Sequence, residues 1–193
     1  MSFSLPRLAT LSITLTALVA PAFAEPPPRY YAEDPQASVR RGWNIGGSLG
    51  AGEISCEGPG CDAFTEAGSF DLQVGHMLRP RLRVVGDLWV MAHRDDDLTV
   101  SHTIVTGGLQ LWVINRLWLR GGIGLARAGF DYDRGFVEAS DETETVFGVA
   151  GTIGFEIMSR RRFALDVQLR GGTGFYDDNQ AHNGALALGV TWY

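Results

Sequence analysis

The sequence predicts an all-β fold, an eight-stranded antiparallel up-and-down transmembrane β-barrel that follows an N-terminal signal peptide. Apolar residues alternate with small or polar residues in eight segments, and short basic connections alternate with mostly longer acidic ones. The composition agrees, because 25 glycines among 193 residues and a charged fraction of 20% favour strands over helices. The length suits a single folded domain.

The clearest pair of strands lies in residues 103–129. Residues 105–113 and residues 117–125 carry an apolar residue or glycine at every second position, and mostly small or polar residues lie between them. Because successive side chains of a strand point to opposite faces, this pattern predicts a sheet whose two faces meet different surroundings. Asn115 and Arg116 separate the two segments and predict a tight turn.

Six further segments show the same alternation. They are residues 43–52, 67–78, 81–93, 145–158, 163–170 and 184–193. In an up-and-down barrel, successive connections emerge at opposite ends. Connections after the second, fourth and sixth strands are basic, whereas the others are acidic, as in the segment from Asp131 to Glu144. The alternation therefore predicts one tight basic end and one looser acidic end.

The first 24 residues have the features of a secretory signal peptide. Arg7 precedes a mostly apolar run from Leu8 to Ala20, and Ala22-Phe23-Ala24 provides the small residues that a signal peptidase requires. The run is too short, and too rich in Ser and Thr, for a membrane-spanning helix. We therefore expect residues 1–24 to be removed during export.

The remaining chain divides into a linker and a barrel. Four prolines and scattered charges predict an extended linker over residues 25–41, so the barrel covers residues 42–193. Export allows disulfides, and the only two cysteines, Cys56 and Cys61, lie in one short segment containing Gly and Pro. A redox motif would place two residues between them, and a zinc site would need further ligands nearby. We therefore predict a structural disulfide between Cys56 and Cys61.

Side-chain volume predicts which face points outward. The apolar face carries Phe, Leu, Ile, Val and Trp in nearly every segment, whereas the interior of an eight-stranded barrel has little room. The small and polar set therefore faces the lumen. Trp89, Trp112 and Trp118 belong to this inner set, while Trp43 and Trp192 belong to the outer set near a membrane edge.

We expect charged side chains to close the lumen. Arginines and carboxylates of the inner set, Asp71 included, are close to balanced, as buried charges must be if they are to pair. The predicted charge network comprises Arg83, Asp87, Arg120, Glu156, Asp166 and Arg170.

Over about residues 42–193, the chain resembles the small outer-membrane barrels of the OmpA/OmpX-like β-barrel domain family. The resemblance rests on the export signal, the paired alternating strands, the alternating connections and the aromatic C-terminal strand GALALGVTWY. In that family the last residue usually faces lipid, whereas here Trp192 belongs to the lipid-facing set and Tyr193 follows it.

The resemblance implies a place in the outer membrane of a Gram-negative cell envelope. It implies contact with outer-membrane lipid and lipopolysaccharide, and recognition of the C-terminal strand by the outer-membrane insertion machinery. Short turns on the periplasmic side are typical of such barrels, so we expect the acidic connections to face outward. We expect a monomer, and the net charge of −6 argues against nucleic acid as a partner.

These features predict a structural, membrane-anchoring or surface-interaction role, with no catalytic residues, no cofactor and no metal site. Two alternatives stay open: a secreted, soluble lipocalin-like barrel that binds a small apolar ligand, and a lipid A-modifying barrel enzyme. No His has a Ser two residues away on the same strand face. A catalytic base would therefore be His93, His102 or His182, with a nucleophile from another strand.

Overall fold

The structure, a computed structural model, describes residues 40–57, 64–95, 98–134, 137–142, 144–160, 162–177 and 179–193. The predicted signal peptide and the predicted linker up to residue 39 lie outside these ranges. Cys61 lies outside them too, so its disulfide with Cys56 stays a prediction. None of the described residues belongs to a helix long and apolar enough to span a membrane.

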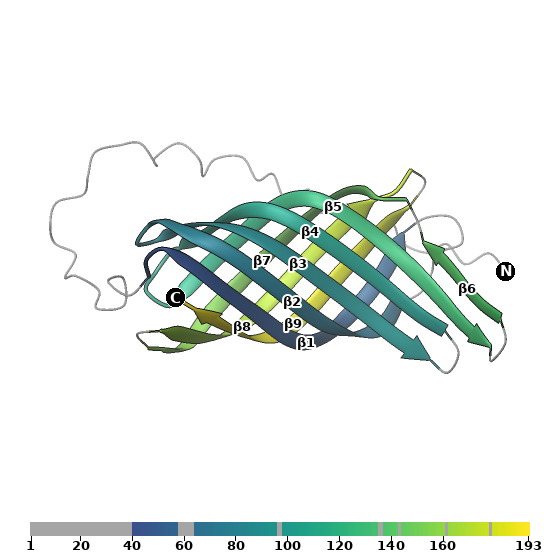
Figure 1. The fold of residues 1–193 in the computed structure, drawn as a ribbon, viewed down its shortest axis with the longest axis horizontal. Helices are drawn as coiled ribbons and strands as arrows, with labels where there is room; N and C mark the ends of the chain where they lie inside the picture. Colours follow the sequence, from purple (N-terminus) through teal and green to yellow (C-terminus); the bar gives the residue numbers. More distant parts are fainter. Residues whose placement is uncertain are drawn as a thin grey trace, which may run out of the picture. The chain divides into compact units, whose positions relative to one another are not determined.

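Nine antiparallel strands make up the described chain, and eight of them form the wall of a closed barrel (Figure 1). Their bounds are β1 Trp43–Glu57, β2 Phe64–Arg79, β3 Leu82–Asp95, β4 Leu98–Trp112, β5 Leu117–Arg134, β6 Val137–Glu142, β7 Val146–Ser159, β8 Phe163–Phe175 and β9 Gln180–Trp192. All nine strands belong to one compact unit.

The barrel closes because every wall strand pairs with a neighbour on each side. Strands β1 to β5 pair in order, β7, β8 and β9 continue the wall after β5, and β9 pairs with β1 from Trp192 to Gln180. Closure leaves no unpaired edge, as a sheet within a lipid bilayer requires. Strand β6 pairs only with the part of β5 that extends beyond β7. The predicted eight-stranded antiparallel barrel is confirmed.

The connections sort into two ends of the barrel, as the antiparallel order demands. The end that we call the terminal end carries Arg40, Tyr193 and the turns at residues 80–81, 113–116 and 160–162. The opposite end, called the hairpin end, carries Glu57, Asp95, Arg134 and Phe175, which are the last residues of β1, β3, β5 and β8.

The strands reach further at the hairpin end than the alternation predicts. Strand β1 continues to Glu57 and β5 to Arg134. The segment from Asp131 to Glu144, expected to be a long connection, instead contains the end of β5 and all of β6. Apolar alternation stops there, but main-chain pairing between neighbouring strands does not depend on it.

The turn between β4 and β5 is wider than the predicted two-residue turn. Strand β4 ends at Trp112, which pairs with Trp118, so residues 113–116 connect the strands. The main-chain N–H groups of Val113 and Ile114 both donate to the carbonyl of Leu117, at 3.0 and 3.4 Å. The register that aligns the two tryptophans therefore leaves Val113 and Ile114 outside the ladder.

The two faces of the wall differ as predicted. Every wall strand presents large apolar side chains outward, and Trp43 is 73% exposed. By contrast, Trp89 is fully buried, and Trp112 and Trp118 are each 2% exposed. The exterior is therefore apolar, and the lumen holds polar, charged and aromatic side chains.

Candidate functional site in the lumen

The described part of the chain buries four arginines and four carboxylates inside the barrel. They are Arg40, Arg83, Arg120, Arg170, Asp71, Asp87, Glu156 and Asp166. All six members of the predicted charge network are among them. Their charges balance, which meets the main requirement for placing ionised groups away from water.

Arg170 on β8 lies at the centre of this network. Its Nη1 lies 2.7 Å from Oδ2 of Asp71, and its Nη2 donates to Oδ2 of Asp87 at 2.6 Å. Its guanidinium also lies over the ring of Trp89, 4.7 Å from the centroid, while the indole N–H of Trp89 donates to Ser69. One arginine thus holds carboxylates from β2 and β3 through charge-assisted contacts.

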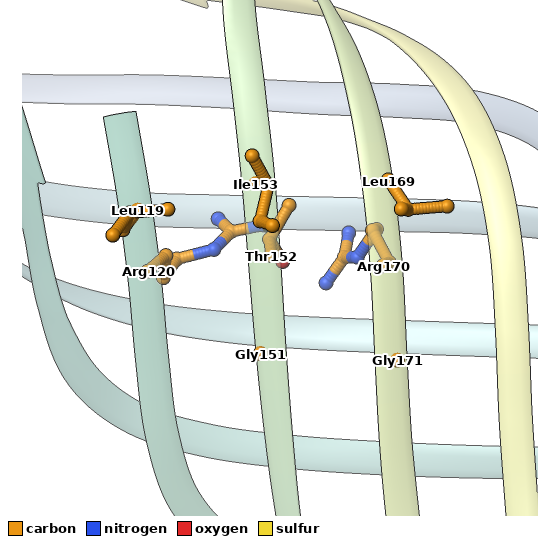
Figure 2. Close-up of a pocket in the computed structure, with 8 residues that line it drawn as sticks. All are labelled: Leu119, Arg120, Gly151, Thr152, Ile153, Leu169, Arg170 and Gly171. Carbon is orange, nitrogen blue, oxygen red and sulfur yellow. The ribbon is translucent and has the colours of Figure 1, made fainter. Parts of the chain in front are cut away.

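Arg120 on β5 contacts the same group of residues from the opposite side. Figure 2 shows the Arg120 and Arg170 side chains reaching toward each other across β7, near Thr152. Nη1 of Arg120 donates to Gln73 at 2.6 Å and lies 3.4 Å from Oδ1 of Asp87. Asp87 therefore has arginines on two sides.

Gly151 and Gly171 form a shallow depression in the outer wall at this level. Its volume is about 560 Å³, and its lining residues are those drawn in Figure 2. The depression exists because these two exposed glycines place no side chain between Leu119, Ile153 and Leu169.

Two further predicted members of the network, Arg83 and Asp166, bind side-chain amides. Arg83 donates to the amide oxygens of Gln73 and Gln110, each at 3.2 Å. Asp166 accepts a hydrogen bond of 2.6 Å from Gln168. The buried glutamines therefore belong to the network, although the network predicted from the sequence contains only charged residues. In the sequence, these glutamines can be recognised as polar residues at lumen-facing positions of the alternation.

Glu156 pairs with Arg40, which lies in the predicted linker. Nη2 of Arg40 donates to Oε2 of Glu156 at 2.7 Å, and both side chains are at most 2% exposed. The other oxygen of Glu156 accepts the indole N–H of Trp112, also at 2.7 Å. The sequence carries one sign of this pair, because its lumen-facing positions hold three arginines and four carboxylates.

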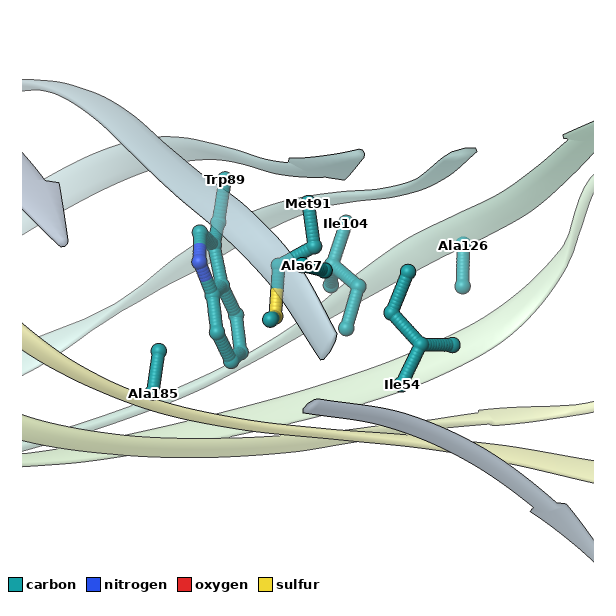
Figure 3. Packing of buried hydrophobic residues seen from close by; sticks show 7 residues of the cluster. All are labelled: Ile54, Ala67, Trp89, Met91, Ile104, Ala126 and Ala185. Atoms are coloured by element: carbon teal, nitrogen blue, oxygen red, sulfur yellow. The ribbon is translucent and has the colours of Figure 1, made fainter. Parts of the chain in front are cut away.

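Two groups of apolar side chains pack inside the barrel. Along β3, Trp89 and Met91 follow Asp87 toward the hairpin end, where they pack with Ile104 and Ile54 (Figure 3). At the terminal end, a second group contains Met77, Trp112 and Trp118. In the described lumen, the charges around Arg170 and Arg120 lie between these two apolar groups, and the Arg40–Glu156 pair lies beside Trp112 at the terminal end.

The three histidines named as alternative catalytic bases each contact a different group. His102 is buried in the lumen and contacts Asn183 at 2.8 Å, and the imidazole of His93 contacts the main-chain carbonyl of Glu66. His182 lies 3.0 Å from the hydroxyl of Thr173 and 4.0 Å from the carboxylate of Glu57. That last distance exceeds a hydrogen bond, and the Glu57 side chain is 82% exposed. The hydroxyl of Thr173, and not the carboxylate of Glu57, is therefore within hydrogen-bonding distance of the His182 imidazole.

Comparison with solved structures finds the same barrel. One match is Ail, the attachment invasion locus protein of Yersinia pestis, which was solved alone and in complex with the heparin analogue sucrose octasulfate. Ail is 15% identical to this chain, with a TM-score of 0.59. The match covers 78% of this chain and 99% of Ail. Neisserial surface protein A is 13% identical, with a TM-score of 0.57 and coverage of 78% and 96%.

Sequence comparison adds no relative, since no protein-family model and no curated protein matches the chain. At such low identity, the structural matches establish the architecture. The closed wall, the apolar exterior and the filled, charged interior are the features of this architecture that the chain reproduces. The chain therefore has the fold of the small eight-stranded outer-membrane β-barrels.

Proposed function

We propose that the chain is an outer-membrane β-barrel protein with a closed lumen and a structural, membrane-anchoring or surface-interaction role. The observation that carries this proposal is the inverted distribution of side chains, with apolar residues exposed on every wall strand and charged residues buried. So large an apolar surface would cause association in water but is favourable in lipid. A soluble lipocalin-like barrel would need the reverse arrangement.

The filled lumen supports a non-catalytic role at the barrel ends. Lipid and lipopolysaccharide would contact the apolar wall, and β9 with its aromatic end would be read by the insertion machinery. We propose a monomer without cofactor, metal or catalytic site. The acidic connections of the hairpin end would repel a polyanion, so we do not extend to this chain the sulfated ligand of the Ail complex.

The mature protein is expected to fractionate with the outer membrane. It should also migrate faster on a gel when unheated than when boiled, because a closed barrel stays compact in detergent until heat unfolds it. Cell fractionation followed by paired gels measures both properties, with a soluble periplasmic protein as the control. Recovery in the soluble periplasm would contradict the proposal and support the secreted lipocalin-like alternative.

The protein is expected not to conduct ions. Eight strands enclose little space, and three buried tryptophans and eight buried charged residues occupy it. Purified protein in planar lipid bilayers should therefore give no stable single-channel steps. Reproducible steps of uniform size from the wild-type protein, absent from mock preparations, would contradict a closed lumen and indicate a narrow pore.

A further inference from the structure

We propose that the terminal end of the lumen contains a guanidinium-binding site, formed by Glu156, the ring of Trp112 and the main-chain carbonyl of Asn115. Arg40, from the segment before β1, occupies this site as a plug. The wall strands thus build a receptor for a planar cation, and the chain fills it from outside the barrel wall.

The contacts of Arg40 match a guanidinium group. Its Nη2 lies within hydrogen-bonding distance of two acceptors, Oε2 of Glu156 at 2.7 Å and the carbonyl of Asn115 at 2.9 Å. Its Cζ lies 4.7 Å from the centroid of the Trp112 ring. Both hydrogen bonds come from one nitrogen, so the contact with the Trp112 ring distinguishes the ligand. A guanidinium is weakly hydrated and stacks on aromatic rings, whereas an ammonium group is a compact, strongly hydrated charge. The site therefore favours guanidinium over ammonium.

The wall alone supplies the site. Glu156 belongs to β7, Trp112 ends β4, and Asn115 lies in the turn that follows. Trp112 also donates its indole N–H to Glu156, which fixes the carboxylate independently of Arg40. The receptor is therefore complete without the residue that fills it.

The main chain directs Arg40 into the lumen through Gly42. Gly42 has a φ of +70°, in the left-handed region that glycine adopts without strain. Its carbonyl accepts the N–H of Met77 at 3.0 Å, which ties this bend to β2. The chain thus turns immediately before β1, and Arg40 enters the barrel while remaining outside the strand ladder.

The balance of buried charges explains why the site should prefer a cation. Without Arg40, three buried arginines would face four buried carboxylates, and Glu156 would lose its cation. An unpaired buried carboxylate is costly, so a cation of the right shape should bind there and stabilise the barrel. A small guanidinium compound in solution is the matching ligand.

Chemical rescue tests the proposal. Arg40→Ala should lower the temperature at which the purified barrel loses its fast gel mobility by roughly 10 °C. Low millimolar methylguanidinium should restore most of this loss with saturable concentration dependence, whereas methylammonium should not. Arg160→Ala removes an exposed arginine at the same end and should change neither the midpoint nor the response.

A double variant keeps the test decisive. Arg40→Ala/Glu156→Gln removes both charges, so it should be more stable than Arg40→Ala and should not respond to methylguanidinium. If Arg40→Ala does not fold, folding of the double variant supports the site, and failure of both overturns it. Wild-type stability of Arg40→Ala, equal rescue by methylammonium, or rescue of the double variant would each overturn the proposal.

Discussion

Replacing Arg170 with alanine is expected to cause the largest loss of stability in the charge network. The change leaves Asp71 and Asp87 inside the barrel without the cation that they share. Removing one partner of a buried ion pair costs about 3–5 kcal/mol, because the other charge stays buried without compensation. Asp87 keeps Arg120 at 3.4 Å, whereas Asp71 is left with a hydrogen bond of 3.3 Å from Ser48.

The midpoint of urea unfolding in detergent or lipid vesicles measures this loss. Arg120→Ala serves as the matched control, because its pair with Asp87 is longer, and it should lose less stability than Arg170→Ala. The double variant Arg170→Met/Asp71→Asn should recover much of the loss, since Asp71 no longer carries a charge and Asp87 stays paired with Arg120. An Arg170→Ala protein as stable as Arg160→Ala would contradict the assigned role of this buried cation.

The wall of the barrel could be predicted because the alternation of side chains that indicates it can be read within each strand. A period of two assigns each residue to a face without knowledge of its neighbours, so it correctly placed Trp89 inside and Trp43 outside. The same signal failed at the hairpin end. There β5 and β6 continue as paired strands without apolar alternation, because the main-chain hydrogen bonds of a ladder do not require it.

The partners inside the lumen could not be predicted, because they depend on the stagger of the whole barrel. Alternation places Arg170 and Asp87 on the inner face, but they are 83 residues apart in sequence and meet only when the wall closes. Arg40 precedes the first strand, so no alternation applies to it. Only the surplus carboxylate among the lumen-facing charges indicated that another cation was needed.

The second large loss of stability is expected from substituting one of two adjacent glycines on β4, Gly107 and Gly108. Gly108 faces the lumen, and a Cβ built there would lie 2.1 Å from the carbonyl oxygen of Gly121 and 2.6 Å from the Cα of Gly122. Both atoms are main chain, so no rotamer change relieves the contact, and β4 and β5 would have to separate. Gly107 points outward, and a Cβ there meets nothing within 4 Å.

We therefore expect Gly108→Ala to destabilise the barrel by about 3 kcal/mol through overpacking. Gly107→Ala should leave stability unchanged or raise it by up to about 1 kcal/mol, because alanine restricts the unfolded chain. The two variants differ only in which face of one strand receives the methyl group. Urea unfolding of both in the same detergent measures the difference. Equal stabilities would contradict the assignment of these faces, and a larger loss for Gly107→Ala would require β4 to be turned the other way in the wall.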